Sequence, residues 1–231
     1  MKKLQLISMV ALILLGFSGC EKAKITNQAT ADVFVKAIKN AQGATVYTAV
    51  HSVFSYNVMK SVSVTSPDGT TKQLTNYENG GNSFFNEPVE ADYSTTIPTI
   101  GTYTYLAKFN DGEEITYTNV LAAATILPAN ITSLAKSANG DSVYIKWDAI
   151  ATSHAYQLKV MKGTTQVFYQ PAFVDASVPL KPSLRLGLRI SNLTSNAGTG
   201  TFDFELTGLL FESTTYDYLQ AISSSTQSIE L

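Results

Sequence analysis

The sequence predicts an all-β protein made of two tandem β-sandwiches. Short runs rich in Val, Ile, Thr, Tyr and Phe recur about every 8–12 residues, a spacing typical of sandwiches and barrels. Turn-forming sequences separate the runs at 66–69 (SPDG), 79–82 (NGGN), 110–112 (NDG) and 139–141 (NGD). The uncharged segment 122–128 (AAATILP) divides the chain into two stretches of single-sandwich length. We therefore expect one sandwich at 31–126 and a second at 127–231.

The first 19 residues have the features of an export signal. Lys2 and Lys3 precede an apolar run that is too short to span a bilayer. Segment 17–20 (FSGC) then resembles the lipobox of bacterial lipoproteins. The resemblance implies cleavage before Cys20, attachment of lipid such as palmitate to Cys20, and a polar tether at 20–30. The alternative is an ordinary signal peptide with a coincidental cysteine.

The first predicted sandwich contains two hairpins. Residues 59–65 and 71–74 flank one turn, and residues 101–109 and 113–121 flank another. Segment 32–41 (DVFVKAIKNA) fits a helix nearly as well as a strand, and we favour a strand. This half resembles the immunoglobulin-like modules of Bacteroidota surface lipoproteins in style, without a motif that would assign functional residues.

The second predicted sandwich has three strictly alternating runs. We expect the following side chains to face its core: Val143, Ile145 and Trp147; Tyr156, Leu158 and Val160; Phe202, Phe204 and Leu206. The half resembles a fibronectin type III domain, a family with a Trp on its second strand, a Tyr on its third and a Leu-x-Pro-Gly-Thr-x-Tyr segment before its sixth. Trp147, Tyr156, Leu210, Thr214 and Tyr216 take those places. The resemblance implies that Tyr216 forms a tyrosine corner.

The two arginines of the chain share one face of segment 184–190 (LRLGLRI). One interpretation is a site in which Arg185 and Arg189 grip a carboxylate or phosphate of a partner. We favour a hairpin in which Ile190 pairs with Phe202, because Arg189 would then lie opposite Asp203. Arg185 would lie diagonal to Glu205, and both contacts would be ordinary cross-strand ion pairs.

Few residues suggest catalysis or metal binding. The single cysteine excludes an intrachain disulfide and a CxxC pair, and a net charge of −2 gives no basic surface for nucleic acid. His51 and His154 lie near no nucleophile motif. Glu87, Glu90 and Asp92 form an acidic cluster that is a candidate for Ca²⁺, although a solvated loop is the simpler interpretation. No cofactor is expected.

Exposed aromatic rings are the remaining candidates for binding. If 84–85 and 168–169 lie on strands, one ring of each pair points outward, so Phe85 and Tyr169 are candidates for stacking on sugars or partners. Segment 141–143 (DSV) is similar to the pattern at which Bacteroidota attach O-glycans, which would place a glycan on Ser142.

The function expected from these features is non-enzymatic. We expect a lipoprotein anchored to an outer membrane, on its cell-surface or periplasmic face, that presents β-sandwich modules to another envelope protein or a polysaccharide. One alternative is a dedicated glycan-binding protein of a carbohydrate uptake system. Another is an enzyme that uses carboxylates alone, which would require Glu87, Glu90 or Asp92 to be buried together in a cleft.

Overall fold

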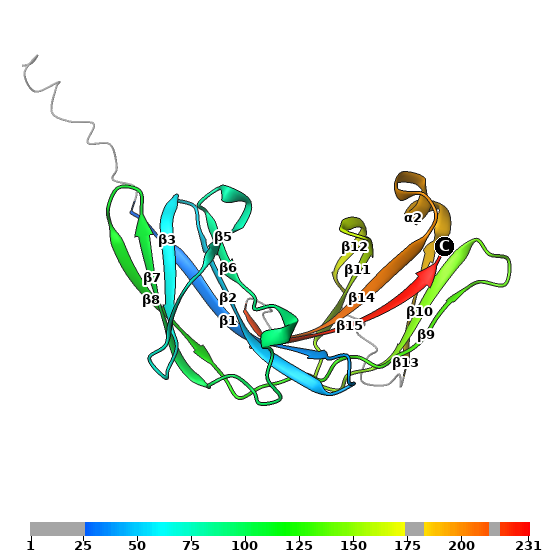
Figure 1. Ribbon diagram of the computed structural model, residues 1–231, viewed down its shortest axis with the longest axis horizontal. Helices are drawn as coiled ribbons and strands as arrows, with labels where there is room; N and C mark the ends of the chain where they lie inside the picture. The colour runs from blue at the N-terminus through cyan, green and yellow to red at the C-terminus, as the bar shows by residue number, and fades with distance from the viewer. Residues whose placement is uncertain (1–25, 174–182, 213–217) are drawn as a thin grey trace, which may run out of the picture.

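The described residues form two hydrophobic cores and three sheets, in agreement with the predicted β-sandwich fold class (Figure 1). The computed structural model describes residues 26–173, 183–212 and 218–231. Cys20, Thr214 and Tyr216 therefore lie outside the described residues, so the lipid attachment and the tyrosine corner stay predictions.

Strands dominate the described residues, and their bounds follow the turn signals. The strands are β1 (Ala29–Lys39), β2 (Thr45–Ser55), β3 (Met59–Thr65), β4 (Thr71–Gln73), β5 (Thr75–Asn76), β6 (Ser83–Asn86), β7 (Gly101–Phe109), β8 (Glu114–Leu121), β9 (Ile131–Lys136), β10 (Ser142–Asp148), β11 (Ala155–Lys162), β12 (Thr165–Phe173), β13 (Ser183–Arg189), β14 (Thr201–Phe211) and β15 (Leu219–Glu230). The helical elements of the described residues are the 3-10 helices η1 (Tyr77–Asn79) and η2 (Glu90–Asp92) and the α-helix α2 (Ile190–Ala197).

One eight-stranded sheet runs through both halves of the molecule in the order β12-β11-β14-β15-β1-β2-β6-β5. A four-stranded sheet, β4-β3-β7-β8, covers one end of it, and a three-stranded sheet, β13-β10-β9, covers the other. Figure 1 shows the result as two arms of a U, with the long sheet lining the inside and the smaller sheets outside. We call the side of the long sheet that is turned away from both cores the inner face.

The two arms are joined by the pairing of β1 with β15. The strands run parallel, with Val35 opposite Ala221 and Ile38 opposite Ser224. Ala221 is fully buried and belongs to the core of the first arm, although it lies in the last strand of the chain. The first sandwich is therefore completed by a strand from the C-terminal half, a long-range contact that no local pattern in the sequence indicates.

The first arm contains the predicted hairpins and a longer first strand than expected. Residues 32–41 were the ambiguous segment, and the strand prediction is confirmed because β1 pairs with β2 along its whole length. The predicted tether is too long, since Ala29 already lies in β1. Asn27 is also buried, and its side chain donates to the carboxylates of Asp111 (2.8 Å) and Glu113 (2.7 Å).

The second core contains every strand residue predicted for it, together with Ala129, Leu193 and Leu231. All nine side chains expected to face it are buried, and the rings of Trp147 and Tyr156 lie 5.5 Å apart. Leu210 differs, because it packs against the first core: β14 crosses the junction, so its last residues reach the other arm. The hydroxyl of Tyr156 accepts a hydrogen bond from the backbone N–H of Ile150 (2.7 Å).

The predicted hairpin between the arginine strand and β14 is wrong. β13 pairs with β10, which places Arg189 opposite Ser142 and Arg185 opposite Lys146. Ile190 begins helix α2, and this helix carries the chain from the three-stranded sheet to the long sheet. Because the two strands lie in different sheets, Asp203 and Glu205 face other partners: Ser228 donates to Asp203 (2.5 Å), and Lys159 pairs with Glu205.

The shared sheet predicts that Ala221→Leu weakens both arms together. The added atoms would overpack the first core at the β1–β15 seam, at a cost of about 1–3 kcal/mol. Urea unfolding followed by Trp147 fluorescence in the second arm and by circular dichroism should shift to lower urea in one coincident transition. Thr226→Leu, on an exposed part of β15, should stay within about 0.5 kcal/mol of the parent. An unchanged Trp147 transition in Ala221→Leu would contradict the coupling.

Candidate functional site

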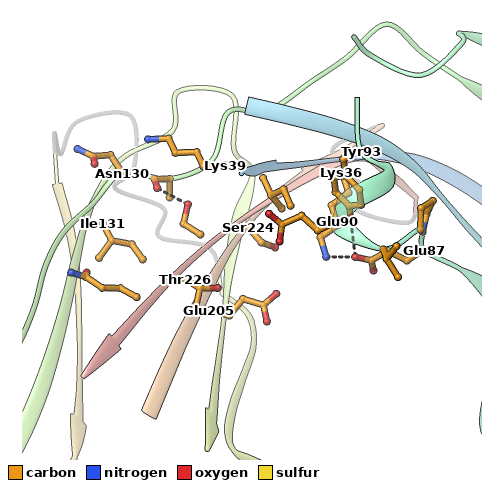
Figure 2. Close-up of a pocket in the computed structure, with 16 residues that line it drawn as sticks. Lys36, Lys39, Glu87, Glu90, Tyr93, Asn130, Ile131, Glu205, Ser224 and Thr226 are labelled. Carbon is orange, nitrogen blue, oxygen red and sulfur yellow. Dashed lines mark hydrogen bonds and ion pairs between the residues drawn. The ribbon is translucent and has the colours of Figure 1, made fainter. Parts of the chain in front are cut away.

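A groove of about 900 Å³ lies where the two arms meet (Figure 2). β1 ends there at Lys39, while β15 continues past it. The residues around the groove come from β1, β14, β15, the loop after β6 and the segment leading into β9; those that carry charge or a hydrogen-bonding side chain are Lys36, Lys39, Glu87, Glu90, Tyr93, Asn130, Glu205, Ser224, Ser225, Thr226 and Gln227. Both arms therefore contribute to one site.

One wall is the acidic loop that follows β6. Glu87 forms an ion pair with Lys36, whose side chain points from β1 to the inner face. The hydroxyl of Tyr93 donates to the same carboxylate at 2.9 Å. Burial of the phenol raises the pKa of Tyr93, and the neighbouring Glu87 carboxylate raises it further, so Tyr93 stays a neutral donor. The contact between Glu87 and Lys36 fixes this loop across the inner face.

The opposite wall belongs to β14 and β15. Glu205 forms an ion pair with Lys159 of β11, and the hydroxyls of Thr207 and Ser224 lie 3.0 Å apart across the two strands. Glu90 and Lys39 are exposed on the rim. The groove thus presents alternating charges and hydroxyls rather than one sign of charge.

Beyond Ser224, the edge of β15 that faces the groove is not paired with a neighbouring strand of the described residues. Pairing with β1 stops at Ser224, and among the described residues no strand pairs with β15 on that side from Ser225 onward. Thr226, Gln227 and Ser228 are exposed. Unpaired N–H and C=O groups of an edge strand are a template for an extended chain. The site is therefore suited to bind an extended polar segment.

The three carboxylates of the acidic cluster have different surroundings. Glu87 is engaged by Lys36 and Tyr93, Glu90 lies on the groove rim, and Asp92 lines a separate small depression beside His51. Within the described residues, no three His, Cys, Asp or Glu side chains are grouped so that they could hold a metal ion. The three carboxylates do not lie buried together in a cleft, since Glu90 and Asp92 are exposed.

Phe85 and Tyr169 both lie on the inner face but on different arms. Phe85 is half-buried on β6, and Tyr169 is 47% exposed on β12, where Gln157 donates to its hydroxyl. Six inter-strand steps separate these strands, or about 29 Å along the sheet. The two rings cannot form a single stacking platform.

Arg185 and Arg189 lie outside the groove, on the outer side of the three-stranded sheet. The guanidinium of Arg185 stacks 3.8 Å from the ring of Tyr144. Gly187, directly opposite Tyr144, makes room for that ring, because a Cβ there would lie 2.5 Å from it. The stacking accounts for the glycine in an otherwise alternating strand. Ser142, the candidate glycan site, is half-buried at the start of β10.

Each histidine ring makes a hydrogen-bond contact within the chain. The imidazole Nδ1 of His51 lies 3.0 Å from the hydroxyl of Tyr105, which donates to the backbone carbonyl of Asp32 (3.1 Å). Burial, with a smaller effect of Lys72, lowers the pKa of His51 from 6.5 to about 4. His154 accepts a hydrogen bond from the backbone N–H of Phe211 (3.2 Å) at Nδ1. Neither imidazole faces the groove between the arms.

Sequence reasoning missed Lys36, Tyr93 and Glu205. Each is an ordinary outward-facing strand or loop residue in the sequence, with no motif around it. They meet because β1 pairs with β15, which places β14 within reach of the loop after β6. An acidic cluster was the one detectable signal, and it identified the loop but not its partners.

Comparisons with known proteins identify no family and give solved structures of low similarity. No family model matches the chain, and no curated protein matches its sequence. The chain is similar to a tetra-tandem repeat in the extending region of a large adhesion protein, with 16% identity, a TM-score of 0.31 and coverage of 87% of this chain and 50% of that one. A segment of two fibronectin type III domains from chicken tenascin gives 10% identity, a TM-score of 0.29 and coverage of 89% and 100%.

A 1.5-MDa bacterial ice-binding adhesin gives 15% identity and a TM-score of 0.27, over 87% of this chain and 63% of that one. The chain thus spans half of the first structure and less than two thirds of the third. The architecture described above rests on the strand topology of this chain. In the described residues, no helix has the length and apolar character to cross a membrane.

The environment of His51 predicts a pH effect on stability. Because its pKa in the folded chain lies below that of the unfolded chain, neutral His51 contributes stability that is complete above pH 6.5 and is lost as the pH falls through about 4. The difference in unfolding free energy between the parent and His51→Gln should therefore shrink over that interval. NMR of the His51 ring should give a midpoint near 4, and a midpoint near 6.5 would show that the ring is solvated.

Proposed function

We propose that this protein is a non-catalytic lipoprotein of a bacterial outer membrane that binds an extended segment of another envelope protein in the groove between its arms. The observation that carries the proposal is the free edge of β15 inside that groove. Main-chain hydrogen bonds along such an edge supply affinity, and flanking side chains select the partner. Lys39 and Glu90 lie on the rim, where they could form ion pairs with charged side chains of a bound strand.

Anchoring supports this role from the sequence side. The lipobox-like segment 17–20 places the lipid on Cys20, ahead of a polar linker. Several acyl chains would hold the protein durably, since one chain binds a membrane only marginally. Exposure at the cell surface or on the periplasmic face is part of the proposal.

A second candidate function is polysaccharide binding beside a carbohydrate uptake system. The exposed ring of Tyr169, with its hydroxyl held by Gln157, favours it, because such a ring can stack on a sugar. Lys159 and Glu205 lie on the same face and offer polar contacts next to it. This candidate uses the inner face of the second arm rather than the groove.

The anchor is tested by metabolic labelling with a palmitate analogue. The parent should incorporate label and fractionate with membranes, whereas Cys20→Ala should do neither, because the acceptor sulfur is gone. Ser18→Thr, which keeps the cysteine, is the matched control and should still be labelled. Equal labelling of the parent and Cys20→Ala would refute lipid attachment at this residue.

The groove is tested by a photo-crosslinking residue placed at Thr226 in living cells. We expect a reproducible protein adduct from Thr226 and none from Lys146, which is exposed on β10 on the outer side of the second arm. Equal adducts at both positions, or none at Thr226, would contradict partner binding in the groove. If a glycan array instead gives a signal that Tyr169→Ala abolishes, polysaccharide binding is the function.

A further inference from the structure

The free end of the first arm, far from the groove, carries a group of exposed apolar and aromatic side chains. Tyr56 is 92% exposed in the loop between β2 and β3, with Phe54 at 47% and Val58 at 44% beside it. The rings of Phe54 and Tyr56 meet edge to face with centroids 5.2 Å apart. Tyr77, at the start of η1, is also exposed. We call these four residues the tip.

The tip is held firmly despite its exposure. The side chain of Asn82 donates to the backbone carbonyls of Ser55 (3.0 Å) and Tyr56 (3.2 Å). Gly81 approaches the same loop closely: its carbonyl accepts from Met59 N–H (2.7 Å), and a Cβ on it would lie 2.7 Å from Val58. The loops of Tyr56 and Tyr77 are therefore tied together, and the aromatic rings project from a fixed base.

The N-terminal end of the described chain reaches this same place. The hydroxyl of Ser55 donates to the carbonyl of Gln28 (2.5 Å), and the amide of Asn57 donates to the carbonyl of Thr26 (3.3 Å). Figure 1 shows the start of β1 at the free end of the first arm, beside the β2–β3 and β7–β8 connections. An attachment point upstream of Thr26 would therefore be connected to the chain next to the tip.

We infer that the tip rests in the headgroup region of the membrane to which the chain is anchored. The inference depends on the proposed attachment at Cys20. Cys20 and Thr26 are separated by at most about 22 Å of extended chain, so the lipid cannot reach the bilayer unless the tip lies close to it. Phenol and indole rings prefer the membrane–water interface, where the ring is buried and the polar group stays hydrated.

Charge has little part in this contact. Glu21, Lys22 and Lys24 belong to the predicted tether, and Lys60 follows the tip in sequence, while Asp111 and Glu113 lie at the adjoining turn and are bridged by Asn27. With both signs present, anionic lipid should neither attract nor repel this end strongly. The contact is therefore expected to depend on the aromatic side chains.

The contact would orient the molecule. β2 runs from Ser55 at the tip to Thr45, which pairs with Lys39 at the groove. Its 11 residues hold the groove about 33 Å from the tip. The first arm would thus act as a spacer that keeps the proposed binding edge of β15 away from the headgroups, where a second protein has access.

The test uses the lipidated protein with Val58→Cys carrying an environment-sensitive fluorophore, reconstituted in phosphatidylcholine vesicles. We expect emission at shorter wavelength than in water and quenching by headgroup-spin-labelled lipid, both unchanged when anionic lipid is added. Phe54→Ser/Tyr56→Ser, which alters only exposed side chains, should lose both effects. Tyr169→Ser, an exposed tyrosine on the other arm, should keep them.

Each outcome separates this inference from the anchor. Water-like emission in protein that carries the palmitate label, or a shift that survives Phe54→Ser/Tyr56→Ser, overturns membrane contact and leaves the anchor intact. Absence of label on Cys20 overturns both. A concentration-dependent shift in Cys20→Ala without vesicles would show that a second copy covers the tip, and a shift produced only by added polysaccharide would show a glycan there.

Discussion

The parallel pairing of β1 with β15 is the contact on which the rest of the molecule depends. It turns two sandwiches into one structure with a common sheet, so the cores of the arms share strands. The segment that joins the two arms is bound to the same strand: Ser223 donates to the carbonyl of Leu127 (2.9 Å), and Ser225 donates to that of Ala129 (2.7 Å). Gly208 lies under this crossing, where a Cβ would touch Ile150 and Ile126.

The groove is a by-product of how that pairing ends. β1 stops at Lys39 while β15 runs to Glu230, so the shared sheet changes abruptly from paired to open edge. Lys36 lies on the inner face near the end of β1 and forms an ion pair with Glu87. This ion pair holds the loop after β6 beside the open edge. Removing the β1–β15 contact would separate the two walls of the groove. The proposed binding site therefore depends on the same strand pairing that joins the two arms.

Local pattern predicted what local interactions determine. The alternation of 143–147, 155–160 and 201–206 identified the strand residues of the second core but not Ala129, Leu193 or Leu231, and the turn sequences located the hairpins. The predicted hairpin between Ile190 and Phe202 was wrong, because the alternation of apolar residues in the strands on either side of α2 is equally compatible with pairing of those two strands. Only the helix between them and the fit of Tyr144 over Gly187 assign β13 to the other sheet. The groove depends on strands distant in sequence, and parallel pairing leaves no turn signal to find it.

The same topology determines how a load would travel through an anchored molecule. A pull along the axis of β1 from its N-terminal end would act on a strand that pairs with β2 over its full length and with β15 over residues 35–38. Ladder bonds lie across the strand direction, so they resist such a pull together rather than one after another. A partner bound at the open edge of β15, as proposed, would pull on the neighbouring strand of the same sheet. The path from that partner to an anchor at Cys20 would then run through backbone hydrogen bonds within one sheet and would bypass segment 122–128.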